Sequence, residues 1–272
     1  MNRNDLCFCG SGKKYKKCHI GIHSESMMAR LIKIENHIDD KVSEYYSNKQ
    51  NKPPCHKGCN SCCYDYFTVS NIELYRIFLA ISTWDKNDIE KLKDRCKNYT
   101  QLFKASHPDI YYNLEKEVDA NLIYDDLNIV RKTDFPCVFL DENNSCMIYE
   151  SRPLICRLHG YVYPAKANDD IYSDNTFICE KIGSRKDSKS WQPNLELLDM
   201  DINFKVIDLT DIGGKLCYQK TYPLFYILGE ELSYQDVNRR LKGNSPLFDM
   251  SEKELKKILH NMSMAKGINV QL

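Results

Sequence analysis

The chain shows a helical period of apolar residues soon after its start. From residue 27 to residue 45, apolar side chains recur at steps of three and four, which places them on one face of an α-helix. Ser24 is a residue type that caps helix starts, and Lys52-Pro53-Pro54 breaks the pattern afterwards. We therefore expect a helix from Ser24 to about Asn48, with an apolar face made of Met27, Leu31, Ile34, Ile38, Val42 and Tyr45.

Three more helices are expected between residues 72 and 122. Ile72 to Ile81 has helical spacing, and Asp85 to Phe103 carries a single apolar stripe. Pro108 suits the first turn of a helix and opens a further helical stretch to Leu122. Cys96 lies on the stripe of the second helix, so we expect it to be a small core residue.

The C-terminal part combines one predicted strand with two predicted helices. Apolar and polar residues alternate from Leu198 to Val206, which is typical of a half-buried strand, and Gly213-Gly214 marks a turn. Tyr222 to Glu231 is expected to be helical, and Ser251-Glu-Lys-Glu254 is a capping box that starts a last helix. The predicted fold class is therefore mainly α, an α-rich α+β protein.

These elements divide the chain into four predicted parts. Residues 1–22 are rich in cysteine and glycine and too few to form a core without a staple, so we expect a small zinc knuckle. Residues 23–52 form a connecting amphipathic helix, and residues 53–185 hold most of the remaining cysteines in a metal-binding domain. Residues 186–272 form a C-terminal extension that follows a polar loop.

The overall charge of the chain is balanced. Its 272 residues include 38 basic and 38 acidic ones, so no global field favours an anionic membrane, and we expect no sequence-specific nucleic-acid binding. The first seven residues lack the apolar core of a signal peptide, and no apolar run approaches the roughly 18 residues of a membrane span. We therefore expect no membrane partner and a cytoplasmic location.

Cysteine carries the clearest chemical signal. The chain has 13 cysteines, an odd number that would leave a pure disulfide framework with a spare thiol. In a reducing compartment, clustered cysteines are more often metal ligands or catalytic groups than disulfides. Because thiolates select soft or borderline metals, the sequence predicts zinc or iron binding.

The first cysteine group lies at the N-terminus. Cys7 and Cys9 are one residue apart, and Cys18-His19 completes a set of four sulfur and nitrogen ligands suited to a closed tetrahedral zinc site. Gly10-Ser-Gly12 allows the backbone to turn sharply between the two ligand pairs. Three thiolates around one zinc leave a net negative charge, which nearby lysines would offset: Lys13, Lys14, Lys16 and Lys17.

The segment from Cys7 to His19 closely resembles the SEC-C motif, which is best known from the tail of the preprotein-translocase motor ATPase. The resemblance implies a structural zinc held by Cys7, Cys9, Cys18 and His19. It also implies a docking role, because the motif in the translocase docks on a partner and can contact the ribosome. A protein or ribosome partner is therefore expected for this lysine-rich segment.

The second cysteine group comprises Cys55, Cys59, Cys62 and Cys63. On a helix these four would share one face, whereas in a loop Cys59-Asn-Ser-Cys62 has the spacing of a metal-binding turn. Neighbouring cysteines rarely reach one ion together. Either two metals share the cluster, or one of Cys62 and Cys63 faces the core.

The third group comprises Cys137, Cys146, Cys156 and, more distantly, Cys179. Pro153 suits the start of a short helix that would contain Cys156. Backbone N–H groups at that start, together with Arg152 and Arg157, would stabilise thiolate charge. His56 and His159 adjoin cluster cysteines, but exposed or hydrogen-bonding histidines are expected more than ligands.

These two groups together resemble the YkgJ-type cysteine-cluster family, which has a CxxxCxxCC motif and is described as zinc- or iron-chelating. Three segments carry the resemblance: Cys55 to Cys63, Pro136 to Leu140, and Cys146 to Arg157. The resemblance implies metal chelation without one established reaction. A related cluster occurs in the flagellin lysine methylase, where it is associated with iron–sulfur chemistry and S-adenosylmethionine. This chain has no glycine-rich cofactor loop after a strand.

The leading functional hypothesis is a metal-binding protein with a zinc knuckle that docks a partner and a cysteine cluster that holds zinc, iron or an iron–sulfur cluster. Counting thiols does not separate zinc from iron–sulfur, and a zinc centre that only braces the domain is a structural alternative. One competing hypothesis is an iron–sulfur-dependent enzyme that modifies proteins, similar to a lysine N-methylase. Another is a ribosome-associated adaptor.

Overall fold

The computed structural model describes residues 1–47, 55–115, 130, 132–158 and 222–231, with residues 250, 251, 253, 254 and 257. Within these ranges the chain is mainly helical, which confirms the predicted fold class. The described strands are β1 (Thr68–Val69) and β2 (Tyr222–Pro223). The described α-helices are α1 (Met27–Ser47), α2 (Asn71–Ile81), α3 (Lys86–Ser106), α4 (Pro108–Glu115), α6 (Leu154–Leu158) and α9 (Leu224–Glu231). None of these helices has the length and apolar content needed to cross a bilayer.

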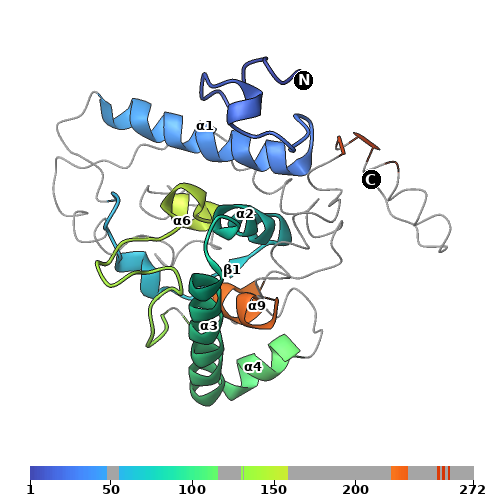
Figure 1. The fold of residues 1–272 in the computed structure, drawn as a ribbon. Helices are drawn as coiled ribbons and strands as arrows, with labels where there is room; N and C mark the ends of the chain where they lie inside the picture. The colour runs from blue at the N-terminus through green and yellow to red at the C-terminus, as the bar shows by residue number, and fades with distance from the viewer. Residues whose placement is uncertain are drawn as a thin grey trace, which may run out of the picture.

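Helix α1 lies between the N-terminal segment and the rest of the described protein (Figure 1). It contacts α2 and α6 on its inner side and carries the segment before Ile22 on its outer side. Because both sides are covered, the buried surface of α1 is wider than the single predicted stripe. Met28, Ala29 and Ile32, which lie outside that stripe, are also buried.

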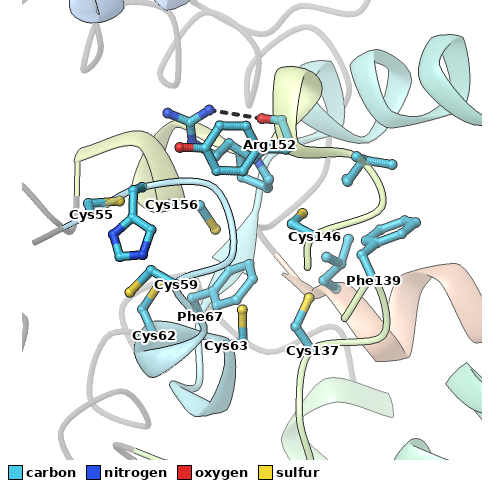
Figure 2. A pocket seen from close by; sticks show the side chains of 15 residues that line it. Cys55, Cys59, Cys62, Cys63, Phe67, Cys137, Phe139, Cys146, Arg152 and Cys156 are labelled. Atoms are coloured by element: carbon cyan, nitrogen blue, oxygen red, sulfur yellow. Dashed lines mark hydrogen bonds between the residues drawn. The ribbon is translucent and has the colours of Figure 1, made fainter. Parts of the chain in front are cut away.

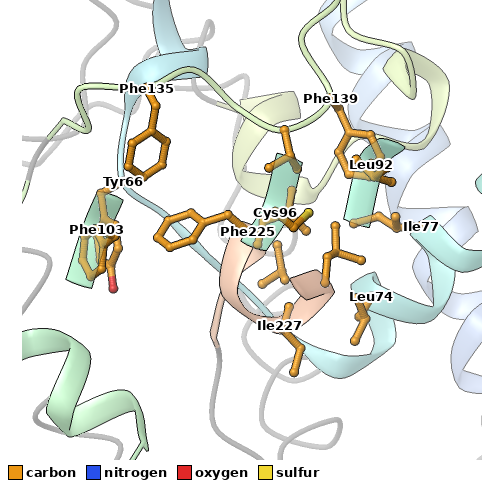
Figure 3. Packing of buried hydrophobic residues seen from close by; sticks show 14 of the residues in the cluster. Tyr66, Leu74, Ile77, Leu92, Cys96, Phe103, Phe135, Phe139, Phe225 and Ile227 are labelled. Carbon is orange, nitrogen blue, oxygen red and sulfur yellow. The ribbon is translucent and has the colours of Figure 1, made fainter. Parts of the chain in front are cut away.

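Helices α3 and α9 lie side by side and form the centre of the larger core (Figure 3). The Phe225 ring of α9 lies 5.2 Å from the rings of both Phe103 and Phe135, measured between centroids. Gly229 of α9 faces Cys96 of α3, and a Cβ built at Gly229 would lie 3.6 Å from the Cys96 Cβ. Cys96 is fully buried in this core, as its place on the apolar stripe predicted.

A short antiparallel pair of strands connects two distant parts of the chain. Thr68 pairs with Pro223, and Val69 pairs with Tyr222. Strand β1 follows the second cysteine group, and β2 leads directly into α9. The pairing therefore fixes the start of α9 beside the cysteine-rich region.

The positions of several elements agree with the sequence predictions. Helices α2 and α3 match the predicted helices to within three residues at each end, and α4 begins at Pro108 as expected. The predicted helix from Tyr222 to Glu231 is confirmed except at its first two residues, which form β2.

Other predictions fall partly or wholly outside the described residues. The capping box is present, with the Ser251 amide donating to Glu254 Oε2 at 2.9 Å and the Glu254 amide donating to Ser251 Oγ at 3.3 Å. The predicted strand over 198–206, the Gly213-Gly214 turn and the part of the third helix beyond residue 115 lie outside the described ranges.

The start of α1 differs from the prediction. The Ala29 amide donates to Ser26 Oγ at 3.2 Å, so Ser26 rather than Ser24 is the N-cap. The main chain turns twice before the helix begins, because the Ile22 amide donates to the His19 carbonyl and the Ser26 amide to the His23 carbonyl. The spacing of the apolar residues gives no sign of these turns, which move the N-cap from Ser24 to Ser26.

This cap predicts different effects for two neighbouring serine substitutions. Ser26→Ala removes the acceptor for the Ala29 amide in a buried position and is expected to lower the free energy of unfolding by about 1 kcal/mol. Ser24→Ala is the matched control and is expected to change it by less than about 0.5 kcal/mol. Urea unfolding followed by far-ultraviolet circular dichroism measures both. Equal losses would show that Ser26 is not the cap.

Candidate metal centres

The N-terminal segment folds back on itself and brings its four predicted zinc ligands together. The Cys7 amide donates to the Lys13 carbonyl at 2.8 Å, and Gly10 and Gly12 turn the chain with φ of 79° and 70°. A 3₁₀ helix, Tyr15–Lys17, then leads to Cys18 and His19. We call residues 1–22 the knuckle. Its donor atoms all lie within 4.8 Å of one another, and they belong to Cys7, Cys9, Cys18 and His19.

The distances between these donor atoms fit a tetrahedral metal site. Cys9 Sγ lies 3.5 Å from Cys18 Sγ, and His19 Nδ1 lies 3.3 Å from the Sγ atoms of Cys7 and Cys18. Ordinary zinc–sulfur and zinc–nitrogen bond lengths imply edges of about 3.5 to 3.8 Å in a regular tetrahedron. The donor set and its spacing therefore fit zinc with adjustments of a few tenths of an ångström.

Hydrogen bonds tune the thiols of the knuckle unequally. Burial raises the pKa of Cys7 to about 11. Burial opposes ionisation of Cys9 as well, but hydrogen bonds with Ser11 outweigh it and lower the pKa of Cys9. Ser11 Oγ lies 3.2 Å from Cys9 Sγ and 3.3 Å from Cys18 Sγ, where it can donate to a bound thiolate.

Burial and the charge of Arg76 lower the pKa of His19, which favours the neutral imidazole that binds metal.

The knuckle is fastened to α1. Asn36 of α1 donates from Nδ2 to the Cys9 carbonyl at 2.5 Å. The Lys33 ammonium lies 5.8 Å from the centre of the Phe8 ring. Cys7 and Cys9 belong to the same buried apolar cluster as several residues of α1. One face of the knuckle is therefore covered by the chain's own helix.

Seven of the eight cysteines predicted for the larger cluster line one cavity (Figure 2). These residues come from three separate segments and are Cys55, Cys59, Cys62, Cys63, Cys137, Cys146 and Cys156. Phe67, Phe139 and Leu224 contribute apolar walls, and His56 also lines the cavity. Cys179 and His159 lie outside the described residues. We call this space the thiol cavity.

The first of these segments is a loop rather than an α-helix. Gly58 has a φ of 93°, and the Cys59 amide donates to the His56 carbonyl in a turn. A 3₁₀ helix, Ser61–Tyr64, then carries Cys62 and Cys63. Of the two arrangements that the spacing allowed, the loop is therefore the one that the structure adopts. Cys62 and Cys63 both line the cavity, so neither is a simple core residue.

Hydrogen bonds hold the second and third segments against the first. The Cys137 amide donates to the Cys63 carbonyl at 2.5 Å. The Met147 amide donates to the Phe139 carbonyl at 2.9 Å, which fixes the turn that carries Cys146.

Helix α6 begins directly after Pro153, as predicted, and the Leu154 amide donates to Glu73 Oε1 of α2 at 3.0 Å. This hydrogen bond holds α6 against α2, and α6 carries Cys156 at the cavity wall.

Burial and the neighbouring thiols favour the protonated form of four cavity thiols in the absence of metal. Burial raises the pKa of Cys137 to about 12 and also raises the pKa of Cys146 and Cys156. A hydrogen bond with Cys63, followed by burial, raises the pKa of Cys62. The charges of Cys62, Cys137 and Cys146 all act on Cys156, so thiols from all three segments influence one another. Metal binding must therefore displace protons.

The thiol cavity is wider than a site for one ion. In the part of the chain that the structure describes, the four donor atoms of the knuckle all lie within 4.8 Å of one another. No three of the described cavity thiols lie as close together as that. The cavity volume is about 50 Å³, whereas one water-sized sphere needs roughly 10 to 15 Å³. Seven thiols also exceed the four ligands of one tetrahedral ion. The donor set thus suits zinc or iron.

Arg152 brings positive charge to this cavity. Its guanidinium donates from Nη1 to the Tyr149 carbonyl at 2.9 Å and lies 4.2 Å from the centre of the Tyr149 ring. Its charge lowers the pKa of Cys146, against the larger opposing effect of burial. Arg152 can therefore offset part of the negative charge that several thiolates would bring.

Several residues of these sites gave no signal in the sequence. Leu224 is separated from the cysteine groups by a long stretch of chain, and the pairing of β1 with β2 and the packing of α9 on α3 bring it to the cavity. Asn36 and Ser11 are ordinary polar residues whose role depends on the folded contacts. The capping-box pattern of Ser70 and Glu73 was detectable, but the second role of Glu73 toward α6 was not.

The raised thiol pKa values predict a pH dependence for the metal-free protein. When the pKa of a thiol is higher in the folded chain than in the unfolded chain, the thiol stabilises the fold at a pH below its unfolded pKa, here 9.0. This stabilisation is lost as the pH rises through the folded pKa. We expect the free energy of unfolding to fall above pH 9 by up to about 1.4 kcal/mol per pH unit for each such thiol. Urea midpoints across this pH range test the expectation.

Cys137→Ala is the matched variant for this measurement, because it removes one raised thiol and also its charge effect on Cys156. Its alkaline loss of stability should be shallower than that of the unmodified chain. Identical slopes would contradict the assignment of this loss to the cavity thiols.

Comparison with protein families agrees with the two groups of donors. Residues 3–20 match the SEC-C motif. Residues 54–180 match the CxxCxxCC family, described as "Putative zinc- or iron-chelating domain". No curated protein and no solved structure matches the chain. The two matches thus cover the four donors of the knuckle and the seven cysteines of the thiol cavity.

Proposed function

We propose that this protein binds metal at two distinct sites, with one zinc in the knuckle and a centre of more than one metal atom in the thiol cavity. The observation that carries the proposal is the convergence of seven cysteines from three segments on one cavity. Zinc and iron both suit such a donor set. Either zinc–thiolate or iron–sulfur chemistry would satisfy it.

The residues that line the cavity would have three different roles in metal binding. The cysteines would supply thiolate ligands, and Arg152 would offset their charge. Phe67, Phe139 and Leu224 would limit the access of water, which tunes the stability and redox potential of a thiolate centre. The protein-modifying enzyme and the ribosome-associated adaptor stay hypotheses that this arrangement does not test.

Metal analysis of protein purified without air tests the proposal. We expect one zinc for the knuckle and more than one further metal atom per chain, with visible absorbance if the second metal is iron–sulfur. Cys137→Ala should lose the further metal and keep the knuckle zinc. Cys96→Ala is the matched control, because Cys96 is buried in the core outside the cavity, and it should keep all the metal.

A single zinc per chain in the unmodified protein would overturn the proposal for the cavity. Equal metal loss from folded Cys137→Ala and folded Cys96→Ala would do the same, because Cys96 does not line the cavity. Circular dichroism of each variant separates loss of metal from loss of fold.

We further propose that the outer face of the knuckle docks an acidic partner surface, such as that of a ribosome. Four lysines of the knuckle are exposed, and its apolar residues Leu6 and Ile20 are 69% and 52% exposed. Exposed apolar groups beside like charges suit recognition of a negatively charged surface. The lysines are Lys13, Lys14, Lys16 and Lys17.

Cosedimentation with purified ribosomes tests this docking role. We expect binding at low salt that weakens steeply as salt rises. Reversal of two charges in Lys16→Glu/Lys17→Glu should reduce binding at least tenfold. The matched control, Lys86→Glu/Lys97→Glu, makes the same charge change at exposed positions of α3 and should bind normally. Equal binding by the two double variants would reject the knuckle as the docking face.

A further inference from the structure

A buried network of charges connects α1 to the wall of the thiol cavity. Glu35 of α1 is 3% exposed and accepts from Arg76 Nε of α2 at 3.1 Å. Arg157 of α6 is 2% exposed, and its Nη2 lies 3.6 Å from Glu35 Oε2. The Arg157 Nη1 atom donates to Asp39 of α1. Two carboxylates of α1 therefore neutralise arginines that belong to the cysteine-cluster domain.

Asp39 joins the two arginines of this network that lie nearest the cavity, Arg152 and Arg157. One carboxylate oxygen accepts from Arg157, and the other lies 3.5 Å from Arg152 Nη2. Arg152 lines the thiol cavity, and Arg157 directly follows Cys156, which also lines it. The Asp39 carboxylate thus contacts Arg152, which lines the cavity, and Arg157, the chain neighbour of Cys156.

The knuckle is attached to α1 close to Asp39. Asn36 lies about one helical turn before Asp39 on α1 and donates to the carbonyl of the zinc-ligand candidate Cys9. Cys7, Cys9 and Leu154 of α6 all belong to one apolar cluster that surrounds α1. A displacement of α1 would therefore disturb the knuckle and the α6 wall of the cavity together.

The physical chemistry of both sites makes this connection energetically important. A knuckle of 22 residues has too little core to fold alone, so zinc binding supplies its folding free energy. Arginines as buried as Arg157 are strongly destabilising when they lose their carboxylate partners. The docked position of α1 is thus favoured both by zinc in the knuckle and by an intact wall at the cavity.

We propose that the knuckle zinc and the cavity metal stabilise each other through α1, with Asp39 as the positioning residue that joins the two sites. This inference rests on the proposed metal binding at the cavity. Loss of zinc from the knuckle loosens α1, releases Arg152 and Arg157, and weakens the hold of the cavity on its metal. Because such coupling is reciprocal, loss of the cavity metal weakens zinc binding in the knuckle by the same factor.

Competition with a chelator measures the coupling in the full-length chain. Cys18→Ser removes a knuckle ligand candidate and should lower the affinity of the cavity for its metal by roughly 5- to 150-fold. Asp39→Asn should lower it to a similar extent. In the double variant Cys18→Ser/Asp39→Asn, the two losses should not multiply, because both act through the same contact.

Two further variants distinguish coupling from general damage. Asp40→Asn makes the same chemical change at the neighbouring exposed residue of α1 and should leave the cavity affinity within twofold of the unmodified protein. Asn36→Ala removes the hydrogen bond between α1 and the knuckle without touching the charge network, and should also lower the cavity affinity. Circular dichroism shows whether each variant keeps its helices.

The outcomes separate this inference from the proposal on which it rests. If the cavity of the unmodified protein takes up no metal, the proposed function fails. If it takes up metal with equal affinity in the unmodified chain and in folded Cys18→Ser, the proposed function stands and the coupling is overturned. Fully multiplicative losses in the double variant would also overturn the route through Asp39.

Discussion

The cost of gathering thiols around one cavity is the constraint on which the rest of the structure depends. A hydrogen bond with Cys63 and burial raise the pKa of Cys62, and burial raises the pKa of Cys137, Cys146 and Cys156. Each of these thiols therefore favours its neutral form until a metal replaces the proton. A centre made of several thiolates then carries excess negative charge. The protein needs rigid walls to hold the ligands in place and nearby cations to offset that charge.

Helix α1 meets both needs from outside the family-matched residues. Burial raises the pKa of Glu35 against the opposing charges of Arg76 and Arg157, because removal of its carboxylate from water disfavours the charged form. Such an ion pair is a poor source of stability but a strong constraint on geometry, because separating the partners leaves charges buried and unpaired. The network therefore fixes where α6 and Arg152 stand relative to the cavity. The N-terminal knuckle, which is attached to α1, can then affect the geometry of the thiol cavity through this network.

Local patterns in the sequence predicted local features well. Apolar spacing located α2 and α3, and ligand spacing brought out the four donors of the knuckle. The pattern could not choose between helix and loop for the second cysteine group, because the positive φ of Gly58 becomes visible only in the folded chain. It also could not show that Leu224 or Asp39 serves the cavity. Those roles arise from pairings between distant segments, and a period along the chain carries no information on them.

The C-terminal residues that reach the core change how the cysteine domain should be understood. Residues 222–231 lie beyond the family match at 54–180, yet β2 pairs with β1, and Leu224 lines the cavity. On the opposite side, Glu35 and Asp39 reach the same domain from before residue 54. The cysteines alone therefore define the ligands but not the walls. Because the geometry of a thiolate centre depends on its surroundings as well as its ligands, properties such as affinity and redox potential belong to this chain's own combination of segments rather than to the shared motif.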